Sequence, residues 1–239
     1  MEKTNQIIKD LTTIFDKYNI SEQDRVKLSN LIMPIITHDE FIKRSNTNTF
    51  PHHDKISLGF HLCSDAIVTY LLSQKHNLSE KEWQRAVIIA MFHDLYELPW
   101  QNNPIKKNMF VNKHGFVHPL EGVINATTWY PEYFEDKKQS DIIIDGIIHH
   151  MYPFPVRAMD ETNPELNNQD KFNNLDSTIQ NLIIESSNRC KIGHISLCKS
   201  KYIEGRIMSN ADKAVSLKKE LINYHSLKAC ITGQNPNLK

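Results

Sequence analysis

A histidine and an aspartate stand side by side, His93-Asp94, at the end of the apolar run AVIIAMFHDLYELPW (residues 86–100). Imidazole nitrogens and carboxylate oxygens both bind Fe, Mn, Zn and related divalent ions. Without a functional role, such a pair followed by Glu97 is not expected at the end of an apolar helix. A His-Asp dipeptide occurs by chance in many chains. The prediction of a metal site therefore depends on the other histidines of the chain.

Further ligand-type residues follow one another along the chain. His61 lies upstream of the pair, and His118, the doublet His149-His150 and Asp212 lie downstream. Adjacent residues of a regular helix point about 100° apart, so the doublet is expected to face two different ions, or one ion and a substrate. The histidines at 38, 76, 194 and 225 fit no such series, and we expect them to be ordinary core or surface residues.

The ordered set H…HD…H…HH…D resembles the HD-domain superfamily of metal-dependent phosphohydrolases. The resemblance runs from about residue 51 to about residue 220 and includes local context beyond the ligands. Its segments are HHDKISLGFH (52–61), HDLYELPW (93–100), HGFVHP (114–119), IIHHMYP (147–153) and ADK (211–213). Helical periodicity along the chain predicts an all-α fold. With this resemblance, the prediction is a single-domain HD-type helical bundle with an N-terminal helical extension.

The resemblance also implies the metal ligands. A first ion would be held by His61, His93, Asp94 and Asp212, with Asp94 able to bridge to a second ion. The remaining ligands, at the positions that two-metal members of the superfamily use, would be His118, His149 and His150. The expected cofactors are therefore divalent metal ions, about two per chain, with Fe or Mn favoured and Zn, Mg, Co or Ni also open.

Other residues receive catalytic or substrate roles from the resemblance. Asp94 is a catalytic candidate, and Glu97 completes an HDxxE form whose glutamate is implicated in acid–base work. Lys213 directly follows Asp212 and is expected to contact a phosphate or to hydrogen-bond around the metal site. Candidates for contact with the substrate are Arg44, His52, His53, His114 and Arg157.

The leading functional expectation is hydrolysis of a phosphate ester of a nucleotide or other small molecule by a metal-activated water. Two metals in one site would activate the water and offset charge on the phosphoryl oxygens. The alternative is a mixed-valent di-iron oxygenase that acts on a small polyol or phosphonate, because the chain is also similar to HD-fold oxygenases such as myo-inositol oxygenase. The histidine doublet and Glu97 favour hydrolysis. A third reading is a non-catalytic binding domain, which is disfavoured because no ligand position is replaced.

Composition narrows the expected partners. Lys+Arg and Asp+Glu both total 28 in 239 residues, so the formal net charge is zero and no nucleic-acid partner is expected. No apolar stretch approaches the roughly 20 residues that span a membrane. The four cysteines lack CxxC spacing and the N-terminus lacks a signal-peptide pattern, which favours a cytoplasmic protein. The expected partner is a small-molecule phosphate ester or nucleotide, with a homodimer also possible.

The helices that would position these residues are predicted from the helical periodicity of the apolar side chains. We expect two N-terminal helices, the second beginning at the cap residue Ser21 and kinked or ended by Pro34. Five further predicted helices would carry the ligands: His61 on 56–76, His93-Asp94 on 79–97, His118 at the start of 120–130, the doublet on 140–151 and Asp212 on 202–221. The helix over 79–97 would begin at a Ser79–Glu82 capping box. The expected domains are a helical extension (1–36), the HD domain (37–225, with a polar insertion at 160–199) and a tail (226–239).

Overall fold

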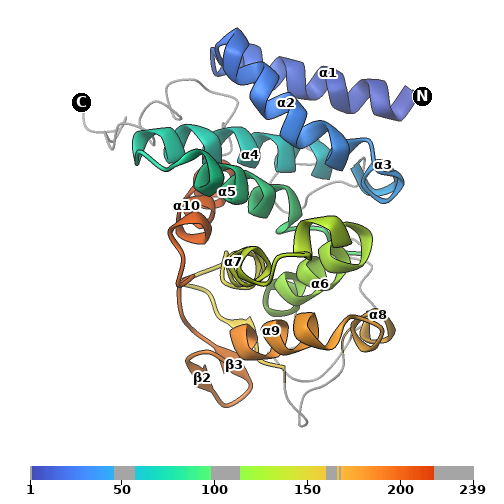
Figure 1. The fold of residues 1–239 in the computed structure, drawn as a ribbon, viewed down its shortest axis with the longest axis vertical. Coiled ribbons are helices and arrows are strands. Elements are labelled where there is room, and N and C mark those ends of the chain that lie inside the picture. The colour runs from blue at the N-terminus through green and yellow to red at the C-terminus, as the bar shows by residue number, and fades with distance from the viewer. Residues whose placement is uncertain (1, 46–56, 98–113, 160–165, 167, 218–239) are drawn as a thin grey trace. The chain divides into compact units, whose positions relative to one another are not determined.

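The computed structural model describes residues 2–45, 57–97, 114–159, 166 and 168–217, and these are mostly helical (Figure 1). The predicted all-α fold class is confirmed. The contacts form two compact units. The first unit contains Met1–Met91 and Asn210–Lys239, and the second contains Phe92–Ser209. The predicted domain boundaries after residues 36 and 225 do not coincide with this division and stay predictions.

The first unit is built around a buried helix. Its helices are α1 (Glu2–Lys17), α2 (Glu22–Ile36), α3 (Asp39–Ser45), α4 (Leu58–Lys75) and α5 (Glu80–Phe92) up to Met91. Both α1 and α3 pack against α4, and most residues of α4 are buried. Because α4 is apolar nearly all round, the polar side chains on it, His61 among them, lie in the interior of the unit.

Two predicted helix starts are confirmed in the first unit. The Ser21 hydroxyl accepts a hydrogen bond from the backbone N–H of Asp24 at the start of α2. The Ser79 backbone N–H donates to Glu82 Oε2 over 2.8 Å, as expected of a capping box before α5. Pro34 lies inside α2, which ends two residues later at Ile36.

The second unit surrounds α6 (His114–Trp129) and α7 (Lys137–Ile148), which pack on each other. Around them lie η3 (Pro131–Phe134), α8 (Gln169–Asn173), α9 (Ser177–Ser187) and strands β1 (Val156–Arg157), β2 (Lys191–Ile192) and β3 (Ile195–Ser196). The antiparallel sheet has the order β1-β3-β2. The last helix, α10 (Ile203–Leu217), begins in this unit and ends in the first.

Several predicted element boundaries are wrong by a few residues. Helix α5 ends at Phe92 and not near Glu97, so His93 and Asp94 lie in a turn, where the backbone N–H of Tyr96 donates to Asp94 O over 2.9 Å. Helix α6 begins at His114, before the predicted start, and Pro119 lies inside it. None of the described helices combines the length and the apolar character that a membrane crossing requires.

Candidate metal centre

Helix α6 holds the His93-Asp94 turn at two points within the second unit. Gly122 lies so close to the turn that an added Cβ would be 2.6 Å from the carbonyl oxygen of His93. One helical turn later, the Asn125 side-chain amide donates to the carbonyl oxygen of Leu95 over 2.6 Å. The side-chain oxygen Oδ1 of Asn125 accepts from Lys171 Nζ at 2.9 Å, which ties α8 to the same place. The position of the turn is therefore set by contacts with its backbone.

We predict that Gly122→Ala lowers the free energy of unfolding and weakens metal binding. The new methyl group would meet backbone atoms that cannot rotate away, so the turn or α6 must shift. Overpacking of this kind costs about 1–3 kcal/mol. Urea unfolding of the metal-free protein measures the first effect, and titration with Mn²⁺ measures the second.

Gly115→Ala is the matched control on the same helix, because a Cβ at Gly115 meets nothing within 4 Å. It should leave the free energy of unfolding unchanged or raise it by up to about 1 kcal/mol, since alanine favours helix. Equal unfolding and Mn²⁺ titration curves for the two variants would show that the close approach at Gly122 does not position the turn.

Four of the predicted ligands gather in the second unit. Ligand atoms of His93, Asp94 and His150 all lie within 4.8 Å of one another. The Asp94 Oδ1 atom is 3.4 Å from His118 Nε2 and 3.8 Å from His150 Nε2. The other oxygen, Oδ2, is 3.7 Å from His93 Nε2. The imidazole rings of His93, His118 and His150 are buried, and their nitrogens surround a carboxylate that is partly exposed to solvent.

The tautomer of His150 prepares it to bind a metal. Its Nδ1–H donates to the carbonyl oxygen of Ile147 over 2.7 Å, which leaves the lone pair of the neutral ring on Nε2. That Nε2 faces Asp94 and lies 3.1 Å from His118 Nε2. Ser209 Oγ donates in turn to the carbonyl oxygen of His150. A backbone carbonyl that fixes the ring in this way is the usual second partner of a metal-binding histidine.

The spacing of these atoms also suits an ion. Imidazole and carboxylate ligands bind a divalent metal at about 2.0–2.2 Å, which puts neighbouring ligand atoms about 3–4 Å apart. The distances of 3.4–3.8 Å from Asp94 to the three rings, and of 3.1 Å between His118 and His150, fall in that range. The set His93, Asp94, His118 and His150, which we call the second-unit cluster, could hold a metal ion.

A second set of ligand-type side chains lies in the first unit. His61 Nε2 is 3.1 Å from Asp65 Oδ2 and 3.9 Å from Asp212 Oδ1, and all three residues are buried. We did not predict Asp65, although its position one helical turn after His61 was a usable signal. The prediction that His61 and Asp212 share an ion with His93 and Asp94 joins residues of two units and stays a prediction.

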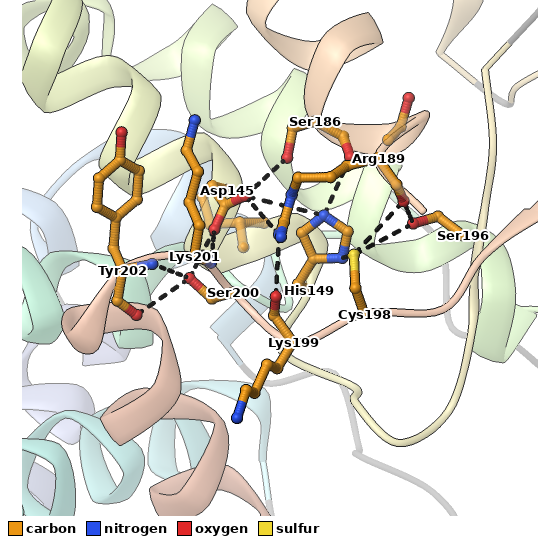
Figure 2. Close-up of polar contacts among 12 residues, drawn as sticks. Asp145, His149, Ser186, Arg189, Ser196, Cys198, Lys199, Ser200, Lys201 and Tyr202 are labelled. Atoms are coloured by element: carbon orange, nitrogen blue, oxygen red, sulfur yellow. Dashed lines mark hydrogen bonds and ion pairs between the residues drawn. The ribbon is translucent and has the colours of Figure 1, made fainter. Parts of the chain in front are cut away.

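His149 belongs to a different network, shown in Figure 2. Its Nε2–H donates to the carbonyl oxygen of Ser186 over 3.0 Å, and its Nδ1 lies 3.8 Å from Cys198 Sγ. Burial lowers the pKa of His149 to about 4, although the Asp145 carboxylate opposes that shift. Among the described residues, His149 is in neither metal-binding group. The two residues of the doublet thus face different partners, and the predicted role of His149 as a metal ligand stays a prediction.

The other predicted site residues are distributed over both units. Glu97 forms an ion pair with Lys171, a residue that the sequence analysis did not identify. Arg44, in α3, is ion-paired with Glu40. Arg157 is buried in β1, and His114 is the first residue of α6. Burial lowers the pKa of Lys213, which is half-buried in α10, and Asp212 opposes this.

None of these last residues belongs to the second-unit cluster, so their predicted catalytic and substrate roles stay predictions. His52 and His53 lie outside the described residues. Comparison with known proteins adds no assignment: no protein family matches the chain, and no curated protein or solved structure is significantly similar to it.

Proposed function

We propose that this protein is a metal-dependent phosphohydrolase acting on a nucleotide or another small phosphate ester. The second-unit cluster is its metal centre. The observation that carries the proposal is the arrangement of His118 and His150 around Asp94, with the Nε2 lone pair of His150 aimed at the carboxylate. The resemblance of the H…HD…H…HH…D pattern to metal-dependent phosphohydrolases supports the same conclusion.

The charge of the cluster favours an anionic substrate. One carboxylate among three neutral imidazoles carries a single negative charge, so a divalent ion would leave the centre with a net charge of about +1. A phosphate ester brings the negative charge that completes the balance. A divalent ion supplies Lewis acidity, which activates water for attack on phosphorus and offsets charge on the phosphoryl oxygens.

The protein's own residues hold this centre in place. The ring nitrogens of His93, His118 and His150 lie 3.4–3.8 Å from the carboxylate oxygens of Asp94. Ile147 fixes the tautomer of His150, and the Leu95 carbonyl fixes the turn through Asn125. Glu97 is ion-paired with Lys171, and a carboxylate in that state has no proton to give. If Glu97 acts as an acid, substrate binding must first separate it from Lys171, which is a testable consequence of this ion pair.

We predict that phosphate release depends on bound metal. Protein purified without oxygen should release phosphate from at least one member of a panel of nucleotides, sugar phosphates and cyclic dinucleotides. A chelator should abolish the release, and added Mn²⁺ or Fe²⁺ should restore it. Consumption of oxygen by iron-loaded protein, without phosphate release, would favour the oxygenase instead. Metal-loaded protein that is inert in both assays would contradict enzymatic function on these substrates.

A further inference from the structure

Two cysteines flank the small hairpin of the second unit. Cys190 directly precedes β2, and Cys198 lies two residues after β3, with Lys191 opposite Ser196 in the register between them. Cys198 Sγ is 3.4 Å from the carbonyl oxygen of Arg189, whose peptide bond leads into Cys190. Figure 2 shows Cys198 beside this carbonyl and beside the ring of His149. The hairpin register and this contact therefore bring Cys198 next to the peptide unit that carries Cys190.

Their exposure differs in a way that suits stepwise oxidation. Cys190 is exposed and accessible to a small reagent, whereas Cys198 is half-buried behind it. Arg189 and Lys191 flank Cys190 in the sequence, and exchange proceeds through the thiolate of the attacking cysteine. The third described cysteine, Cys63, is fully buried in the first unit, where burial raises the pKa of its thiol to about 12. The hairpin pair is therefore the reactive dithiol among the described cysteines.

We propose that Cys190 and Cys198 are a redox-modification site, oxidised to an intramolecular disulfide by low-molecular-weight disulfides. The Cys190 thiolate attacks one sulfur of the reagent RS–SR, which forms a mixed disulfide and releases RS⁻. Cys198 then attacks the Cys190 sulfur, the mixed disulfide breaks, and the second RS⁻ leaves. Each released thiolate takes up the proton lost by one cysteine, so two protein thiols and RSSR give one protein disulfide and two RSH.

This modification is independent of the proposed hydrolase activity. It would close a covalent ring around the hairpin and remove the S–H group that lies 3.8 Å from His149 Nδ1. His149 is the neighbour of His150 in the sequence, so this contact lies next to the segment that carries one ligand of the second-unit cluster.

Oxidised glutathione provides the test. The full-length chain carrying Cys230→Ser, fully reduced at the start, is incubated with the reagent, its free thiols are blocked, and it is digested with trypsin. Cleavage after Arg189, Lys191 and Lys199 gives the peptides CK and IGHISLCK. We expect these two peptides to be linked by a disulfide and to carry no glutathione.

The single variants identify the order of attack. With Cys198→Ser, Cys190 should retain glutathione as a stable mixed disulfide, because the second thiol is missing. With Cys190→Ser, Cys198 should react at least tenfold more slowly than Cys190 does. Thermal unfolding checks that both variants fold. A parent chain that keeps glutathione on Cys190, or that gives unlinked CK and IGHISLCK, would overturn the proposal.

Discussion

Replacing Asp94 with asparagine should abolish metal binding by the second-unit cluster and lower kcat/KM for phosphate release by a factor of about one thousand. The Asp94 carboxylate faces His93, His118 and His150, with nitrogen–oxygen distances of 3.4–3.8 Å. Asparagine keeps the shape of the side chain but removes its charge, so three neutral imidazoles remain. Mn²⁺ affinity, measured by titration, and phosphate release, measured on the same preparation, check the two effects.

Asp136→Asn is the matched control, since it makes the same chemical change at an exposed position of the second unit. Asp136 accepts a hydrogen bond from the Gln139 backbone N–H as the N-cap of α7, and asparagine caps a helix about equally well. This variant should keep wild-type Mn²⁺ affinity and activity. Wild-type affinity in the Asp94 variant would show that the cluster does not bind the ion through its carboxylate.

Replacing Asp145 with alanine should lower the free energy of unfolding by about 3–5 kcal/mol. The Asp145 carboxylate is fully buried in α7 and is surrounded by donors, as Figure 2 shows. Its Oδ2 accepts from Ser200 Oγ at 2.6 Å and from the Lys201 backbone N–H at 2.8 Å. Its Oδ1 accepts from Arg189 Nη2 at 2.8 Å. Alanine would leave these donors without the charge that they converge on.

Asp141→Ala tests whether the effect belongs to the buried network. Asp141 lies one turn earlier in α7 and bridges to Lys201 Nζ at 2.9 Å, in a pair that is partly open to solvent. Pairs of that kind contribute about 0–1 kcal/mol. In urea, the free energies of unfolding of the two variants should differ by at least about 2 kcal/mol. An equal decrease in the free energy of unfolding for the two variants would mean that Asp145 does not stabilise the second unit through its buried contacts.

The sequence was informative about helices because their apolar faces repeat with a regular period. The all-α class and the helix starts at Ser21 and Ser79 could be read from that period and from cap residues. The strands could not be predicted, because two-residue strands such as β2 are too short to show alternation. The predicted helix over 79–97 extends past the end of α5, because the apolar run 86–100 continues beyond the turn that begins at His93.

The site was predicted in part for similar reasons. His93, Asp94, His118 and His150 lie together in the second unit, but the sequence could not tell His150 from His149. Which of the two histidines faces Asp94 depends on contacts with residues that are far away in the sequence, namely Ser186 and Cys198 for His149. Lys171 was missed because it lies in a polar stretch that resembles a loop. Its pairing with Glu97 depends on tertiary structure alone.

The most direct test of the metal centre is the metal content of the full chain, purified without oxygen and measured by elemental analysis. We expect at least one tightly held divalent ion per chain, and about two if His61, Asp65 and Asp212 also bind one. Protein that carries no stoichiometric metal, and that binds neither Mn²⁺ nor Fe²⁺ when titrated, would contradict this expectation.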